Sequence, residues 1–277
     1  MKTGILIIAA FLIIAAGSAE AIVVDSQGPD GTWENVSVDT RPGLQVSYLL
    51  GQPKNAGERS VFLLFNGGEG AGTYELLNDG TINLSVSFLA RTAPLFVRDG
   101  VSVAIMQPPS DRVRGGMSCG FRASEDHLQD IGKVIESLAH RGFERIFLTG
   151  HSNGTFSAAF AGSRIENNRI KGVVLLSSIS TLWHCYIGPY ISTVRYRVLM
   201  VHHRDDGCRV TPFSGAKKLF SALPPKAAFV EVRGGADPRG DACRSLHRHA
   251  FVGREKEVIE TITDWAGTGK APEIIGE

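Results

Sequence analysis

The chain has 277 residues, a formal net charge of +1 and a hydrophobic content of 43%. Its mixed and nearly balanced charges argue against nucleic acid or an anionic membrane as the main partner, and favour a small-molecule or polymer substrate. The sequence shows no repeat and no low-complexity block, and its length suits one α/β domain with a core on both faces of a sheet.

The N-terminus has the pattern of a secretory signal peptide. Lys2 precedes an apolar run from Ile5 to Ala16, and small residues end in an AEA motif at 19–21. The run is shorter than the ~20 residues that a membrane-spanning helix needs, although an uncleaved anchor is the alternative. We therefore expect residues 1–21 to be removed, a single domain over 22–277, and a secreted or periplasmic protein without stable membrane insertion.

Short apolar runs alternate along the chain with segments that have helical spacing. The predicted strands cover 61–65, 101–106, 145–149, 172–178, 197–203 and 227–232, and the predicted helices cover 127–141, 155–165, 215–223 and 254–266. Continuous apolar strands separated by helices predict a parallel sheet with both faces covered. Two earlier segments, 33–39 and 44–50, predict an antiparallel pair at its edge, giving about eight strands. We expect the tail over 267–277 to fray.

The stretch GHSNG at 150–154 matches the pattern Gly-x-Ser-x-Gly, in which many hydrolases hold a nucleophilic serine. It follows a predicted buried strand and precedes a predicted helix. Such a sharp turn lifts a serine out of the sheet edge and directs the amides of the helix N-terminus at a substrate. We therefore predict that Ser152 is a nucleophile.

A second stretch, GMSCG at 116–120, fits the same pattern. The residues before it are charged and rich in glycine, and the next predicted helix begins only at about Ser124. Ser118 therefore lacks both the strand and the helix, and we interpret it as an ordinary loop residue.

A nucleophilic serine needs a base, and the base needs a carboxylate. Asp205 and Asp206 follow the predicted strand 197–203, and His247 and His249 come just before the last predicted helix. Serine, aspartate and histidine thus occur in the order that α/β-hydrolases show.

From about Trp33 to Trp265 the chain resembles the α/β-hydrolase superfamily. The run VHHRDD is similar to the HGxxD-like run that carries the acid in that family, with His203 in the place of the glycine. The resemblance implies an α/β-hydrolase fold with helices on both faces of the sheet, and it implies that Asp206 is the acid. Asp205 remains the alternative.

The run HAF is similar to the family's HGF-like run around the base, with Ala250 in the place of the glycine. This implies that His249 is the base, with His247 as the alternative. NGGEG at 66–70 resembles the family's oxyanion loop and implies that the backbone N–H groups of Gly68 and Asn153 form the oxyanion hole. Glu69 is the other candidate donor, and an ordinary glycine turn is the plain interpretation.

Four cysteines, Cys119, Cys185, Cys208 and Cys243, lie in the part expected to be exported, where disulfides persist. Sequence alone allows three pairings. On the implied triad, a Cys208–Cys243 disulfide would tie the acid loop to the base loop, so we favour that pair together with Cys119–Cys185.

The segment 181–190 occupies the family's usual lid position and is short, so we expect a small lid or none. Its aromatic residues Trp183, Tyr186 and Tyr190 could line an acyl pocket or simply pack. Three loop arginines, Arg112, Arg114 and Arg122, could favour an anionic substrate, but we interpret them as solvated side chains.

The resemblance implies acyl transfer from a small-molecule carboxylic ester to water through an acyl-enzyme, without a cofactor or metal. A peptide or amide substrate is the alternative. The ligand types in Cys243, His247, His249 and the HHRDD run also allow a metal-binding hydrolase, although their spacing matches no compact zinc motif. A binding protein on the same fold is a third reading, and the sequence does not define the oligomeric state.

Overall fold

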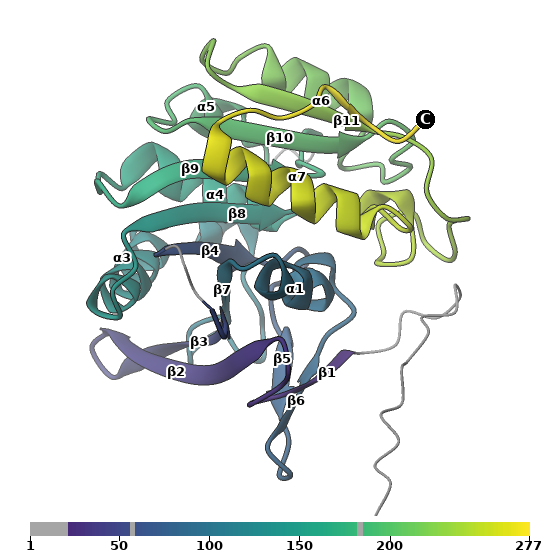
Figure 1. The fold of residues 1–277 in the computed structure, drawn as a ribbon. Coiled ribbons are helices and arrows are strands. Elements are labelled where there is room, and N and C mark those ends of the chain that lie inside the picture. Colours follow the sequence, from purple (N-terminus) through teal and green to yellow (C-terminus); the bar gives the residue numbers. More distant parts are fainter. Residues whose placement is uncertain (1–21, 56–58, 182–184) are drawn as a thin grey trace, which may run out of the picture.

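The computed structural model describes residues 22–55, 59–181 and 185–277. Among these residues, nine strands form one sheet in the order β12-β11-β10-β9-β8-β4-β7-β3-β2 (Figure 1). The strands are β2 (Gly31–Arg41), β3 (Leu44–Pro53), β4 (Ser60–Phe65), β7 (Ser102–Met106), β8 (Arg145–His151), β9 (Ile170–Leu176), β10 (Val198–His203), β11 (Ala228–Val232) and β12 (Ile274–Ile275). Neighbouring strands from β12 to β7 are parallel, whereas β3 pairs antiparallel with β7 and β2. The predicted mostly parallel sheet with an antiparallel edge is confirmed.

Helices cover both faces of this sheet. They are α1 (Phe88–Arg98), α2 (Cys119–Arg122), α3 (Glu125–His140), α4 (Gly154–Arg164), α5 (Gly188–Ile191), α6 (Phe213–Phe220) and α7 (Glu255–Thr268). Apolar residues of α1 and α7 join the core on one face, and those of α3, α4 and α6 join the core on the other. In Figure 1, α1 and the yellow α7 lie in front of the strands, and α3 and α4 lie behind them.

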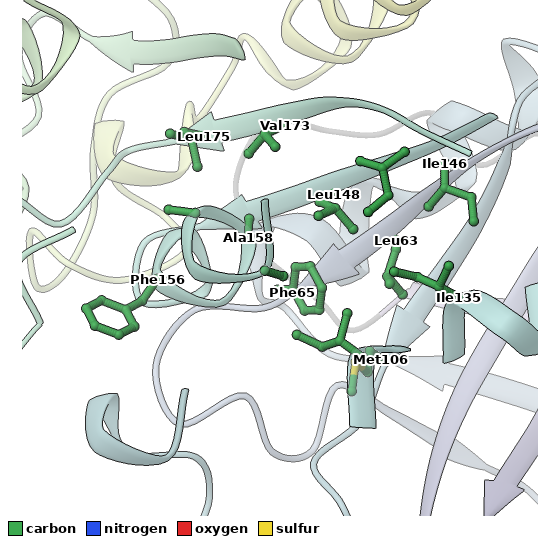
Figure 2. Close-up of a cluster of buried hydrophobic side chains, with 14 of the residues drawn as sticks. Leu63, Phe65, Met106, Ile135, Ile146, Leu148, Phe156, Ala158, Val173 and Leu175 are labelled. Carbon is green, nitrogen blue, oxygen red and sulfur yellow. The ribbon is translucent and has the colours of Figure 1, made fainter. Parts of the chain in front are cut away.

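Strand β4 shows how the sequence builds this two-sided core. All six of its residues are buried. Leu63 and Phe65 belong to the cluster that contains α3 and α4, while Phe62 and Leu64 belong to the cluster on the other face, because successive side chains of a strand point to opposite faces. Figure 2 shows Leu63 and Phe65 near Leu148 of β8. Each large apolar side chain contributes about 1.5–3 kcal/mol when it is fully buried, so the centre of the sheet is a firm support for its edge loops.

The C-terminal tail differs from its prediction. Ile274–Ile275 forms β12, which pairs parallel with β11. The backbone N–H groups of Glu231 and Arg233 donate to the carbonyls of Glu273 and Ile275. The prediction that the tail frays is wrong, because the tail pairs with the edge of β11 and supplies the ninth strand.

A small second sheet and helix α1 also have no counterpart in the prediction. A small antiparallel sheet is formed by β1 (Ile22–Asp25), β6 (Thr81–Leu84) and β5 (Tyr74–Leu76). Helix α1 follows it and contains Pro94 in its interior. An interior proline removes one helical hydrogen bond and weakens the sequence signal. Burial of apolar residues such as Phe96 against the sheet stabilises α1 instead.

The predicted signal peptide, residues 1–21, lies outside the described residues, as does Trp183. Between β9 and β10, the described residues form only the four-residue helix α5, in agreement with the expected small lid. In the part of the chain that the structure describes, no helix is both long and apolar enough to span a membrane.

Candidate active site

Ser152 lies at the sharp turn between β8 and α4. Its backbone φ is 53°, in the left-handed region that residues other than glycine rarely adopt. Among the described residues, only Ser177 and Phe251 are further non-glycine residues with a positive φ. Ser177 contacts the backbone of His249, and Phe251 follows His249 by two residues. Strained residues of this kind cluster at functional sites, and here all three lie around one edge of the sheet.

The glycines of GHSNG allow the backbone to pack closely at this turn. A Cβ atom on Gly154 would collide with the carbonyl of Phe65 in β4, and one on Gly150 would collide with the backbone of Gly154. The loop after β4 also touches the turn, because a Cβ atom on Gly67 would lie 3.0 Å from Cβ of Ser152. The turn is therefore held against the loop that resembles an oxyanion loop.

Ser118 has a different local structure. It is the N-cap of α2, with an ordinary φ of −64°, and its Oγ accepts a hydrogen bond from the backbone N–H of Phe121 at 3.2 Å. The prediction that no helix begins before about Ser124 is wrong, since the four-residue helix α2 begins at Cys119. The side chain of Ser118 serves as a helix cap.

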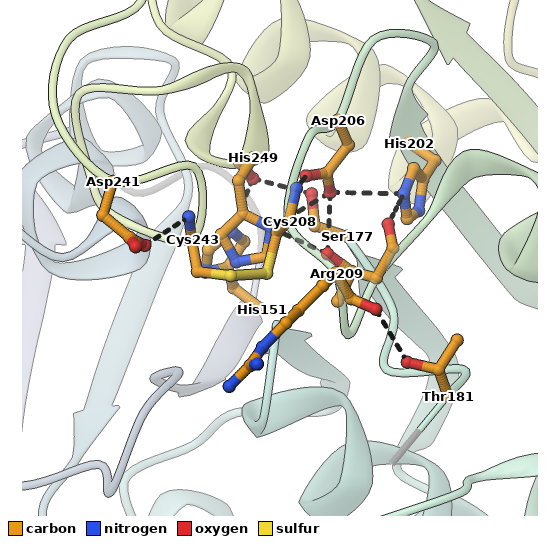
Figure 3. The surroundings of a disulfide bond; sticks show 11 residues. His151, Ser177, Thr181, His202, Asp206, Cys208, Arg209, Asp241, Cys243 and His249 are labelled. Carbon is orange, nitrogen blue, oxygen red and sulfur yellow. Dashed lines mark hydrogen bonds and ion pairs between the residues drawn. A yellow bond between two sulfur atoms is a disulfide. The ribbon is translucent and has the colours of Figure 1, made fainter.

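Asp206 and His249 form a buried pair at the carboxyl edge of the sheet (Figure 3). Asp206 follows β10, and His249 lies in the short 3-10 helix η1 (Arg248–Ala250) before α7. Nδ1 of His249 is 3.0 Å from Oδ2 of Asp206. The hydroxyl of Thr211 donates to the same oxygen at 2.9 Å, and the N–H of Cys208 donates to Oδ1 at 2.9 Å. These contacts fix the orientation of the carboxylate.

A second histidine, His202, also contacts this carboxylate. Its Nε2 donates to the carbonyl of Thr211 at 2.8 Å and lies 3.3 Å from Oδ2 of Asp206. Burial acts to raise the pKa of Asp206, but hydrogen bonds from His202 and His249 outweigh it and hold that pKa below its ordinary value. Asp206 is therefore an anion at neutral pH. This contact of His202 with the acid was not predicted from the sequence, although its position four residues before Asp206 is a usable signal.

The two alternative residues lie differently. The side chain of Asp205 is 61% exposed, and its carboxylate is 3.8 Å from the guanidinium of Arg248. His247 precedes η1, and its Nδ1 is buried without a hydrogen-bond partner in the described part of the chain. The structure thus brings Asp206 and His249 together and leaves Asp205 and His247 apart.

The backbone of His249 is held by two side chains that the sequence analysis missed. Its carbonyl accepts hydrogen bonds from Nε2 of His151 at 3.0 Å and from Oγ of Ser177 at 2.7 Å. Burial lowers the pKa of His151 to about 3, so its ring is neutral with the proton on Nε2. His151 directly precedes Ser152, so this hydrogen bond links the serine turn to the segment of His249. The signal available in the sequence was only its place inside GHSNG.

The loop after β4 carries the predicted oxyanion donor. Gly68 has a φ of +58° and is exposed, and the N–H of Gly70 donates to the carbonyl of Gly67 at 3.1 Å. The side-chain amide of Asn153 donates to the carbonyl of Gly68 at 2.9 Å. The two residues predicted to supply oxyanion donors, Gly68 and Asn153, are therefore in direct contact.

The three arginines considered as solvated loop side chains differ in burial. Arg112 and Arg114 are exposed, and the guanidinium of Arg112 lies 4.8 Å from the ring centre of Phe121. Arg122 is fully buried, so the interpretation of Arg122 as a solvated side chain is wrong. Its guanidinium donates hydrogen bonds to the loop after β4.

Both favoured disulfides are present in the structure, Cys119–Cys185 and Cys208–Cys243. Cys208–Cys243 connects the segment of Asp206 to the segment that leads to His249 (Figure 3). Sγ of Cys119 lies 3.4 Å from Oδ1 of Asn153, so the other disulfide borders the serine turn. Disulfides are typical of proteins in oxidising compartments.

The metal-site alternative finds no support in the side-chain positions. Within residues 22–55, 59–181 and 185–277, no group of three or more His, Cys, Asp and Glu side chains could hold a metal ion. Cys243, one of the proposed ligands, is bonded to Cys208.

The aromatic residues near α5 have unequal surroundings. Tyr190 packs edge-on against Phe156 and Phe160, with its ring centre 5.3 and 4.9 Å from theirs, so this partly buried side chain packs against the core. Tyr186 is 40% exposed, so it lies at the surface and not in the core.

Comparison with known proteins establishes the fold. No protein-family model matches the sequence, and no curated protein resembles it in sequence. Similar solved structures include a dienelactone hydrolase from Anabaena variabilis, with a TM-score of 0.62, 14% identity, and coverage of 85% of this chain and 97% of that one. Est1E from Butyrivibrio proteoclasticus, solved with ferulic acid, has a TM-score of 0.60 and 14% identity, with coverage of 83% of this chain and 97% of that one. An acylaminoacyl peptidase from Pyrococcus horikoshii has a TM-score of 0.58 and 14% identity, with coverage of 85% of this chain and 41% of that one. All are α/β-hydrolases, and this chain has their fold.

Proposed function

We propose that this chain, which has the α/β-hydrolase fold, is an exported serine hydrolase that cleaves carboxylic esters with Ser152, His249 and Asp206. The observation that carries the proposal is the buried His249–Asp206 pair. The backbone carbonyl of His249 accepts a hydrogen bond from His151, the residue directly before the strained Ser152. A structural serine would not need a left-handed backbone, and a structural Asp–His pair would not need so many additional donors.

In this mechanism, Oγ of Ser152 attacks the ester carbonyl while Nε2 of His249 takes the hydroxyl proton. The carboxylate of Asp206 accepts the hydrogen bond from Nδ1 and stabilises the imidazolium that forms. The carbon–oxygen bond of the tetrahedral intermediate then breaks, and the imidazolium gives its proton to the departing alcohol. Water, deprotonated by the same imidazole, then attacks the acyl carbon; the bond from that carbon to Oγ of Ser152 breaks, the imidazolium returns its proton to Oγ, and the acid is released.

The negative oxygen of each tetrahedral intermediate needs donors that are already in position. The backbone N–H groups of Gly68 and Asn153 take this role in the proposal. Their contact through the side chain of Asn153 supports it, because the loop after β4 and the start of α4 then act as one unit.

A peptidase or amidase using the same residues is the second candidate. Structural neighbours named as peptidases, including a puromycin-hydrolysing peptidase from Mycobacterium tuberculosis with a TM-score of 0.57 and 14% identity, favour its inclusion. Esters are the first choice, because the neighbours named as esterases match this chain over nearly their whole length. Export is proposed from the predicted signal peptide together with the two disulfides.

The test is turnover of a panel of p-nitrophenyl esters and p-nitroanilides by the purified protein and two variants. Ser152→Ala should lower kcat for esters by about 10³-fold or more, whereas Ser118→Ala should leave it unchanged. Full ester turnover by Ser152→Ala would contradict the serine mechanism. Faster cleavage of anilides than of matched esters would favour the peptidase.

A further inference from the structure

Arg122 is a buried cation without a carboxylate partner. Its side chain is fully buried at the end of α2, and in the described part of the chain no Asp or Glu lies within ion-pair distance of it. Burial lowers its pKa to about 10, so the guanidinium is charged at neutral pH. An unpaired buried charge is costly unless its hydrogen bonds are satisfied. The positions of its acceptors are therefore informative.

Two of these acceptors are backbone carbonyls of the loop after β4. Nη2 of Arg122 donates to the carbonyls of Asn66 at 3.1 Å and Gly68 at 3.3 Å. Nε donates to the carbonyl of Met117 at 3.3 Å, and Nη1 donates to the hydroxyl of Ser157 in α4 at 2.8 Å. One side chain thus joins the proposed oxyanion loop to the entry of α2 and to the helix that follows Ser152.

Ser157, the acceptor of Arg122 in α4, is itself held by a second hydrogen bond. The hydroxyl of Ser157 accepts from Arg122, so its own hydrogen is available to Nε2 of His127, 2.9 Å away. Burial lowers the pKa of His127 to about 3, which keeps this ring neutral and able to accept. Arg122 therefore binds to a support whose protonation does not change near neutral pH.

These hydrogen bonds determine where the amides of the loop point. In a trans peptide, the carbonyl and the following N–H point in opposite directions. Arg122 holds the carbonyls of Asn66 and Gly68, which lie on both sides of the Gly67–Gly68 peptide, and the bond from Gly70 holds the carbonyl of Gly67. The N–H of Gly68 shares a peptide with the carbonyl of Gly67, so it points away from the N–H of Gly70. The N–H of Glu69, the alternative donor, shares a peptide with the carbonyl of Gly68, so it points away from Arg122.

We propose that Arg122 is a positioning residue for the oxyanion hole. It holds the backbone N–H groups of the loop after β4 in the orientation in which they can donate to an oxyanion, and it places a desolvated positive charge behind that loop. The proposal rests on the proposed function of Ser152. Arg122 does not touch the substrate, and it acts through the N–H groups of the loop. A charge in a water-free site affects a developing oxyanion more strongly than a solvated charge does.

The test compares Arg122→Met with Arg197→Met. Arg197 is a matched control, because its guanidinium also donates to backbone carbonyls, those of Lys171 and Ala266, but just before β10, at the other end of the strands. Arg122→Met should lower kcat for a p-nitrophenyl ester by about 10- to 100-fold with KM changed less than about threefold. Its affinity for an aryl boronic acid, which forms a tetrahedral adduct on the serine, should fall by the same factor as kcat. Arg197→Met should keep both values.

Arg122→Lys is the conservative variant and the deciding one if Arg122→Met does not fold. A lysine keeps the charge but cannot span the same carbonyls, so kcat and boronate affinity should fall together and by less than in the methionine variant. A folded Arg122 variant with the kcat and boronate affinity of Arg197→Met would overturn the inference. Full turnover by Ser152→Ala would instead overturn the proposed function, so the two failures are distinguishable.

Discussion

The chain contains two Gly-x-Ser-x-Gly stretches that fold differently. In GHSNG, a buried strand ends at His151, and Ser152 takes a left-handed backbone before α4. In GMSCG, Ser118 has an ordinary backbone and its hydroxyl caps α2. The same pattern therefore yields a strained turn in one place and a helix cap in the other, because only the first follows a strand of the central sheet.

The second stretch is nevertheless part of the site's support. The N–H of Met117 donates to the carbonyl of Glu69 at 2.8 Å, and Gly116 packs against the side chain of Glu69. Cys119 and Arg122, just beyond, contact Asn153 and the loop after β4. One stretch is proposed to carry the reacting atom, and the other braces the loop opposite to it.

The largest expected effect on activity concerns His249, the proposed base for Ser152 in GHSNG. His249→Ala should lower kcat/KM for a p-nitrophenyl ester by about 10³- to 10⁴-fold, because the proposed mechanism assigns the transfer of the serine proton to this imidazole. His247→Ala is the matched control and should stay within about threefold of the unmodified protein. A loss of kcat/KM in His247→Ala as large as that in His249→Ala would contradict the assignment of His249 as the base.

The second prediction contrasts the last glycine of each stretch. A methyl group on Gly154 would meet the carbonyl of Phe65, whereas on Gly120 the nearest atom, Oγ of Ser118, lies 3.9 Å away. Gly154→Ala should therefore lower the free energy of unfolding by about 3 kcal/mol, and Gly120→Ala should leave it unchanged or raise it by up to about 1 kcal/mol. Urea denaturation of both variants gives the comparison. Equal stability would mean that the two turns are packed alike.

The third prediction concerns the second residue of each stretch, His151 and Met117, both buried, and its effect per pH unit is smaller than that of Gly154→Ala. The pKa of His151 is about 3 in the folded protein, against about 6.5 in an unfolded chain. Below pH 6.5 His151 binds a proton in the unfolded chain but stays neutral in the folded protein. The free energy of unfolding therefore decreases as the pH falls from 6.5 to 3. His151→Gln should reduce the slope of unfolding free energy against pH by about 1.4 kcal/mol per pH unit in that window. Met117→Leu should leave the slope unchanged, and an unchanged slope in His151→Gln would mean that the folded state protonates His151.

The sheet could be predicted from the sequence because its strands are continuous apolar runs, which few other structures can accommodate. Helix α1 and strand β12 could not be predicted, since Pro94 obscures the helical pattern and β12 is a two-residue segment that pairs only because β11 has a free edge. Such elements depend on their neighbours more than on their own residues.

The site divides in the same way. Order along the chain and resemblance to a family predicted Ser152, Asp206 and His249, but they left Asp205 and His247 open, because the burial that differs between the two aspartates and between the two histidines cannot be read from local sequence. Arg122 could not be found, because its interpretation as a solvated loop residue depended on local sequence and its contacts come from distant segments. His202 offered only a weak local signal through its spacing to Asp206.

The most direct test of the central claim is the site of covalent labelling by a fluorophosphonate, read by peptide mapping in one sample that contains both serines. The structure predicts a single adduct on Ser152, none on Ser118, and loss of labelling in His249→Ala. An adduct on Ser118, or an unlabelled protein that still hydrolyses esters in the presence of the probe, would contradict it.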